Sequence, residues 1–171
     1  MLTVPHVIAG AALGSLVGDV PGQTVLAFAV GWGSHYVLDA TPHWERLFGP
    51  NRSGFSTQMP VSEWPKSFLY QALGDALLAL GITTLLLYNS GTLALFWTSP
   101  IFWGAVGGFF PDLLDNTPVI NNYLGKYRFV QRERKFHHDN HVSDEVQQKV
   151  PKYFGLITQL VVCGVGLWIL L

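Results

Sequence analysis

Residues 76–111 read ALLALGITTLLLYNSGTLALFWTSPIFWGAVGGFFP, a run without a single charged side chain. Residues 153–171 also lack charge. A helix at the surface of a soluble protein needs a polar face, whereas about 20 mainly apolar residues are what a helix needs to cross a bilayer. These two stretches therefore favour a membrane protein over the alternative, a soluble and unusually apolar helical enzyme.

The composition agrees with this interpretation. Only 12% of the 171 residues are charged and 49% are hydrophobic, against about 25% charged in a typical soluble domain. A net charge of −1 gives no basis for binding nucleic acid, which requires clustered Lys and Arg. The single cysteine, Cys163, excludes an internal disulfide and any cysteine-based zinc motif.

Hydrophobic runs separated by Pro, Gly and Asn turns predict an all-α, polytopic protein with about five spans. We expect residues 1–171 to form one membrane-embedded helical domain. An interfacial helix is also expected near residues 126–138. The expected parts are a hairpin at 5–40 (helices 5–17 and 24–40), a hairpin at 65–110 (helices 65–88 and 92–110, the latter either straight or kinked at Pro100), a polar metal-binding segment at 111–150, and a C-terminal helix at 151–171.

The basic residues give a topology. With alternating helix directions, all ten Lys and Arg residues fall on the side that holds the N-terminus and the loops at 41–66 and 111–150. The positive-inside bias makes this side cytoplasmic, predicting a multi-pass protein of the inner membrane. Leu171 would then lie outside. The ten residues are Arg46, Arg52, Lys66, Lys126, Arg128, Arg132, Arg134, Lys135, Lys149 and Lys152.

Two sequence patterns bear on helix packing. Residues 30–42 align without gaps on residues 106–118 with six of thirteen positions identical, so the two hairpins are either repeats or similar by coincidence. Gly10, Gly14 and Gly18 lie four residues apart. This small-residue stripe is typical of close helix packing.

The histidines and several aspartates converge on the predicted cytoplasmic side. His35 and Asp39 share a helix face, and unpaired carboxylates in apolar spans are costly unless an ion compensates them. Imidazole and carboxylate ligands suit zinc, with manganese or iron as alternatives. We therefore expect two or three divalent ions, with Asp39, Asp75 and Asp112 as candidate catalytic carboxylates. The expected ligands are His6, His35, Asp39, Asp75, Asp112, Asp115, His137, His138 and His141.

Each part also has a simpler interpretation. His35 and Asp39 could form a local hydrogen bond, Asp112 and Asp115 could belong to a turn, and residues 137–141 could be a solvated loop. Asp75 could pack between helices or belong to a proton path. Whether His43 and Asp139 are ligands stays open.

Three short motifs resemble those of a known family. They are Pro5-His-Val-Ile-Ala-Gly10, Ser34-His-Tyr-Val-Leu-Asp-Ala-Thr-Pro42 and Pro111-Asp-Leu-Leu-Asp115. They are similar to motifs of the LexA-binding, YdjM-like inner-membrane metal-dependent hydrolases, a family grouped with zinc-dependent phospholipase C and the single-strand-specific zinc nucleases. The match covers about a quarter of the chain, and the Pro-Asp and Ser-His motifs occur in reversed order. The resemblance implies metal-dependent hydrolysis of a phosphoester.

The sequence thus predicts an integral-membrane phosphoesterase acting on a phospholipid or lipid-linked phosphate, with membrane lipids as its surroundings. Arg128, Arg132, Arg134 and Lys135 would steer an anionic head group, or simply anchor the chain at the membrane surface. The alternatives are a divalent-metal or proton transporter and a structural membrane protein stabilised by metal.

Overall fold

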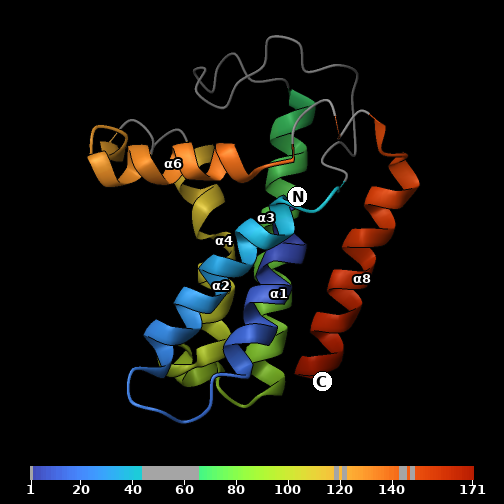
Figure 1. Ribbon diagram of the computed structural model, residues 1–171. Helices are drawn as coiled ribbons and strands as arrows, with labels where there is room; N and C mark the ends of the chain where they lie inside the picture. The colour runs from blue at the N-terminus through green and yellow to red at the C-terminus, as the bar shows by residue number, and fades with distance from the viewer. Residues whose placement is uncertain (1, 44–65, 118–119, 121–122, 143–145, 147–148) are drawn as a thin grey trace.

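The computed structural model describes residues 2–43, 66–117, 120, 123–142, 146 and 149–171. The predicted all-α class is confirmed, since these residues form helices and no strand. Figure 1 shows a bundle with one helix, α6, lying across its end. The elements are α1 (Thr3–Ser15), α2 (Gln23–Asp39), α3 (Lys66–Asn89), the 3-10 helix η2 (Leu93–Thr98), α4 (Pro100–Asn116), α6 (Arg128–Asn140) and α8 (Lys152–Leu170).

Glycines hold α1, α2 and α4 together at close range. A Cβ atom at Gly104 of α4 would collide with the backbone oxygen of Gly10 on α1, and a Cβ at Gly31 of α2 would collide with the oxygen of Gly104. Gly14 faces Pro100 in the same way. Small residues therefore let the three backbones touch, as the stripe predicts. Gly18 is the exception, because a Cβ there would meet nothing within 4 Å.

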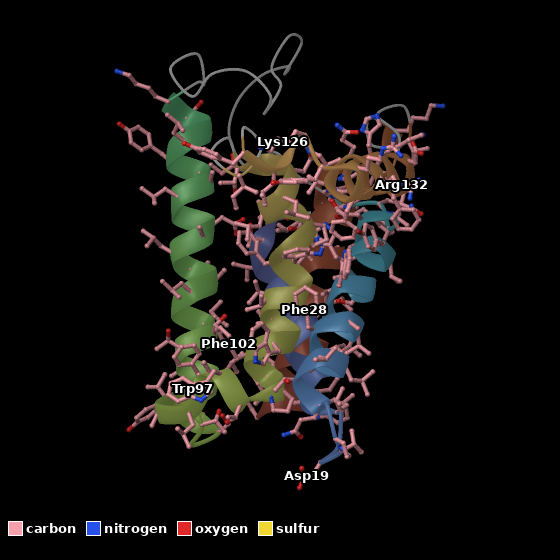
Figure 2. All side chains as sticks on the ribbon, turned by 90° about the vertical axis from the view of Figure 1, so that its left-hand side faces the viewer. Asp19, Phe28, Trp97, Phe102, Lys126 and Arg132 are labelled. Atoms are coloured by element: carbon pink, nitrogen blue, oxygen red, sulfur yellow. The ribbon has the colours of Figure 1, made fainter. Side chains whose placement is uncertain are left out.

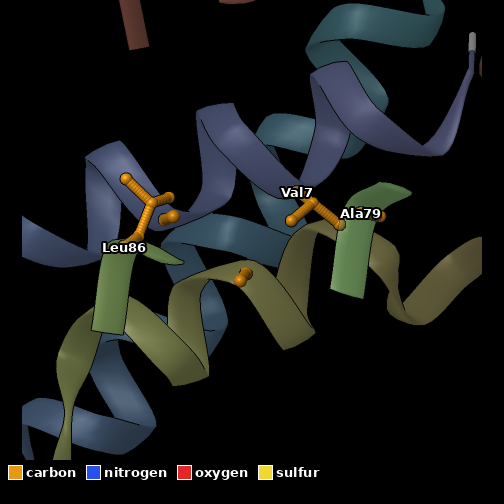
Figure 3. Close-up of a cluster of buried hydrophobic side chains, with 5 residues drawn as sticks. Val7, Ala79 and Leu86 are labelled. Atoms are coloured by element: carbon orange, nitrogen blue, oxygen red, sulfur yellow. The ribbon is translucent and has the colours of Figure 1, made fainter. Parts of the chain in front are cut away.

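Helix α3 joins this trio through a small apolar cluster. Val7 and Ala11 of α1, Ala79 and Leu86 of α3, and Ala105 of α4 are all buried and pack together (Figure 3). Burial of such aliphatic groups contributes roughly 0.8 kcal/mol per methylene. The cluster therefore fixes α3 against α1 and α4.

In the part of the chain that the structure describes, two helices are long and apolar enough to cross a membrane, at Leu69–Asn89 and Tyr153–Leu170. In each, only 17% of the most apolar window is buried, which is unlike the core helix of a soluble protein. Leu80 and Trp168, for example, are 64% and 82% exposed. The five-span topology stays a prediction, because α1 has 13 residues and so measures about 20 Å.

The second hairpin differs from its predicted bounds. The expected helix at 92–110 is two elements, because Ser99 is extended and Pro100 begins α4, as proline favours a first helical position. The expected end at 110 is wrong, since α4 runs through Pro111 to Asn116. An internal proline costs about 3 kcal/mol, and the close packing of α4 against α1 and α2 offsets it. The polar segment therefore begins after Asn116.

Helix α6 closes one end of the bundle. Its residues Val130, Glu133 and His137 are buried, at the spacing that places side chains on one face. Lys126 and Arg132 lie at this end of the molecule and Asp19 at the other, as Figure 2 shows. The helix expected near 126–138 is thus confirmed. Arg46 and Arg52 lie outside the described residues.

Candidate metal centre

The side chains of the candidate site come from the ends of four helices. His6 comes from the first turns of α1, His35 and Asp39 from the last turns of α2, Asp112 from α4 and His137 from α6. The glycine contacts set their separation. A Cβ on Gly108 of α4 would collide with the backbone oxygen of His6, so α4 lies directly against the histidine-bearing turn of α1.

The carboxylate of Asp39 is the centre of the cluster. Its Oδ2 lies 2.9 Å from His35 Nε2 and 3.0 Å from His137 Nε2. Its Oδ1 lies 3.1 Å from His6 Nε2. Asp39 is 1% exposed, and both His6 and His35 are fully buried. The two oxygens of this one buried carboxylate therefore contact imidazole nitrogens from three helices.

The hydrogen bond on the far side of His35 fixes its tautomer. His35 Nδ1 lies 2.7 Å from the carbonyl oxygen of Gly108, and because a carbonyl can only accept, Nδ1 carries the proton. In a neutral ring, Nε2 then presents a lone pair to Asp39 and to His137 Nε2, which is 3.2 Å away. Metal-binding histidines typically donate the other ring N–H to a carbonyl or carboxylate in this way.

The distances among these atoms fit a metal coordination shell. His35 Nε2, His137 Nε2 and Asp39 Oδ2 form a triangle with sides of 2.9, 3.0 and 3.2 Å. Ligand atoms about 2.0–2.1 Å from one zinc ion lie about 2.9–3.4 Å from one another, depending on coordination number. A cation bound by these three atoms would relieve the contact between facing lone pairs.

Among the residues that the structure describes, three overlapping groups of side chains could hold an ion. In each group, one ligand atom from every residue lies within 4.8 Å of the others. His35 belongs to two groups and Asp39 to two, so ions in neighbouring groups would share ligands. The groups are His6–His35–Asp112, His35–Asp39–His137 and Asp39–His43–His141.

The His6 ring has two close neighbours among the described residues. It stacks on His35 with ring centroids 3.9 Å apart, and its Nε2 lies 3.1 Å from Asp39 Oδ1. Its Nδ1 is buried without a hydrogen-bond partner among the described residues. An unsatisfied buried polar group costs about 1–3 kcal/mol, and metal binding at this nitrogen would remove that cost.

The third group includes His43, whose role the sequence left open. His43 Nδ1 lies 2.7 Å from the carbonyl oxygen of Thr41, so its Nε2 is again the lone-pair nitrogen. Its ring lies 5.2 Å from that of His141. Val142 N–H donates to the backbone oxygen of Asp39 at 3.0 Å, which ties the segment after α6 to the end of α2.

Asp75 lies inside the third helix as predicted, but its carboxylate contacts α1. Its carboxylate accepts hydrogen bonds from the backbone N–H groups of Thr3 and Val4, at 2.6 and 3.4 Å. A carboxylate in this position satisfies the open N–H groups at a helix start and opposes the helix dipole. The charge that suggested a metal ligand is thus compensated by α1, and Asp75 belongs to none of the three groups.

Asp115 and His138 are also outside the three groups. Asp115 lies behind His137, with Oδ2 3.7 Å from His137 Nδ1 and Oδ1 3.1 Å from Arg134 Nε. It is therefore placed to orient a ligand. His138 is exposed, because one residue along a helix turns the side chain away from the face that holds His137.

This contrast between adjacent histidines gives a test. His137→Ala removes a candidate ligand atom that lies 3.0 Å from Asp39. Loss of an outer-shell partner alone lowers metal affinity about 10–100-fold, so we expect loss of a direct ligand to lower bound metal at least about tenfold. His138→Ala should leave metal content unchanged. Elemental analysis of both purified variants checks this. Equal metal loss in both would contradict the assignment.

Sequence reasoning missed Glu133. Its Oε1 accepts a hydrogen bond from Tyr36 Oη at 2.6 Å, and Tyr36 Oη accepts one from Trp32 Nε1 at 2.7 Å. Glu133 is 5% exposed, and its Oε2 is buried without a partner among the described residues. Burial raises the pKa of this carboxyl. Its position four residues before His137, on the same helix face, was the available signal.

Comparison with known proteins adds no relative. No protein-family model matches the chain, and neither a curated protein nor a solved structure matches it. The resemblance to the YdjM-like family therefore stays a prediction. The functional argument depends on the geometry of the site.

Proposed function

We propose that this protein is an integral-membrane, metal-dependent hydrolase that acts on a phosphoester of a lipid. The observation that carries the proposal is the buried Asp39 carboxylate, which meets His6, His35 and His137 at 2.9–3.1 Å. A buried histidine and carboxylate set of this kind suits zinc, and also manganese or iron.

The sharing of ligands supports more than one ion. His35 and Asp39 each occur in two of the three groups, and two ions about 3.5–4 Å apart supply Lewis acidity and a nucleophilic water for phosphoester displacement. In this chain His6, His35, Asp39, Asp112 and His137 would hold the ions, with His43 and His141 at the outer edge. Asp115 would orient His137.

Arg134 supports an anionic substrate. Its Nε is bonded to Asp115 at 3.1 Å, which places the guanidinium directly behind the His137 ligand. Its Nη2 is buried and lacks a partner among the described residues. Guanidinium groups bind phosphate oxygens strongly through two N–H donors. This N–H would be available to a phosphate oxygen bound beside Asp115.

The lipid assignment follows from the proposed position at the membrane. The two candidate spans, Leu69–Asn89 and Tyr153–Leu170, expose apolar side chains. The cluster includes His137 of α6, the helix at the end of the bundle that carries Lys126 and Arg132 (Figure 2). By the positive-inside bias this end faces the cytoplasm, at the depth of lipid head groups.

A hydrolysis assay tests this function. Detergent-purified protein, supplied separately with zinc, manganese and iron, is incubated with phosphatidic acid and phosphatidylglycerol. We expect release of phosphate or of a phosphorylated head group that a chelator abolishes and added metal restores. Hydrolysis insensitive to chelation, or none by metal-loaded protein across these phosphoester lipids, would contradict the proposal. Divalent-ion flux in liposomes without hydrolysis would favour the transporter instead.

A further inference from the structure

A cavity of about 400 Å³ lies between α3 and α8, beside the first turn of α1. Its volume is within the range of small-molecule sites, about 300–1,000 Å³. Its walls are almost entirely apolar. They include Leu2, Val4, Pro5, Leu78, Leu156 and Leu160.

Two of the polar side chains at this cavity already bind the start of α1. Asp75 accepts a hydrogen bond from Thr3 N–H at 2.6 Å, and Gln159 Oε1 accepts one from Leu2 N–H at 3.4 Å. Tyr70, Gln71 and Cys163 also line the cavity, and the other side chains of the lining are apolar. A lining of this kind favours a hydrocarbon chain over a charged or sugar ligand.

The surroundings of the cavity identify the hydrocarbon. Its two long walls belong to the two helices that are apolar enough to cross a membrane. Leu78 and Leu160, which line it, are 57% and 61% exposed, so the cavity is continuous with the apolar outer surface of both helices. Water does not fill an apolar cavity, whereas neighbouring acyl chains can enter it.

We propose that this cavity binds one acyl chain of a membrane lipid. The site rests on the membrane placement proposed above and is independent of metal chemistry. Val4 and Pro5 line the cavity, while the adjacent His6 ring stacks on His35. In the first turns of α1, Val4 and Pro5 would therefore contact the lipid chain, and the next residue, His6, belongs to the metal centre.

Two glycines of α3 provide a matched test. Gly74 lines the cavity, and a Cβ atom built there meets nothing within 4 Å, so Gly74→Phe fills the space without a backbone collision. Gly81 lies seven residues on, near the same helix face. Its Cβ would also meet nothing within 4 Å, and it is not part of the cavity lining. Gly81→Phe is therefore the control.

Native mass spectrometry would count phosphatidylethanolamine retained by delipidated protein after this lipid is added back. The wild type and Gly81→Phe should retain one molecule, and Gly74→Phe should bind it at least about tenfold more weakly, since losing the burial of roughly two methylene groups has that effect. If Gly74→Phe does not fold, Leu160→Trp fills the cavity from the α8 wall instead. Its control is Val161→Trp, because Val161 is the next residue and does not line the cavity.

Equal retention by the cavity and control variants, or none by the wild type, would overturn the lipid site. Metal content measured on the same samples should be unchanged in all variants, which separates this result from failure of the metal centre. Release of the wild type from membranes by an alkaline wash would contradict the membrane placement and with it this site.

Discussion

Asp39→Asn should remove most of the bound metal and lower phosphoester hydrolysis at least about a hundredfold, since losing outer-shell partners alone costs 10–100-fold. The substitution keeps the volume of the side chain but replaces a carboxylate that meets three imidazole nitrogens within 3.1 Å. Elemental analysis and the lipid-phosphate assay measure the two effects. Size-exclusion chromatography and circular dichroism would confirm that the variant folds.

Asp75→Asn is the matched control, because the sequence marked both aspartates as catalytic ligands. In the structure Asp75 receives N–H groups from the start of α1. Its amide variant should therefore keep full metal content and lose about 1 kcal/mol of stability, as for a weakened helix cap. An Asp39→Asn protein with normal metal and full hydrolysis would contradict the site, as would loss of metal in Asp75→Asn alone.

Gly104→Ala should strongly destabilise the fold. A Cβ atom there would collide with the backbone oxygen of Gly10 and approach the Cα of Gly14 at 2.9 Å. Backbone atoms cannot move aside as a side chain can, so we expect a loss of about 3 kcal/mol or more, at the upper end for overpacking. Separating α1 from α4 would also displace His6, so metal content should fall in parallel.

Gly33→Ala provides the comparison on α2. A Cβ at Gly33 meets nothing within 4 Å, and alanine is favoured over glycine inside helices by about 0.5–1 kcal/mol. Its melting temperature should be equal or slightly higher. Thermal unfolding of both variants in the same detergent measures the difference. A Gly104→Ala protein as stable as Gly33→Ala would show that the three helices do not pack backbone to backbone.

The core of the site could be predicted because its residues share local signals. His35 and Asp39 lie four apart near a helix end, and His6 begins the preceding helix. The stripe of Gly10 and Gly14 likewise predicted close packing. These inferences need only helix periodicity and alternating helix direction.

The residues that were misplaced depend on contacts distant in sequence. Asp75 looked uncompensated because its partners, Thr3 and Val4, lie about 70 residues earlier on another helix. His138 could not be separated from His137 because the sequence did not show which face of the helix expected near 126–138 packs against the bundle. Glu133 resembled one more solvated charge on a polar helix, and only its burial on the inner face of α6 and its hydrogen bond from Tyr36 reveal it.

The end of α4 shows packing overriding a local rule. Proline usually ends a helix at the preceding residue, which predicted a stop at Phe110. The buried position of Pro111 and the contact of Gly107 and Gly108 with α2 and α1 continue the helix instead. This extra turn is what brings Asp112 to His6 and His35.

The metal content of the purified wild-type protein tests the central claim most directly. Inductively coupled plasma mass spectrometry on protein from detergent should find two or three equivalents of zinc, manganese or iron. X-ray absorption at the metal edge should show nitrogen and oxygen ligands at about 2.0–2.2 Å. A folded, stable protein that holds no divalent metal, and binds none when it is added, would contradict the account.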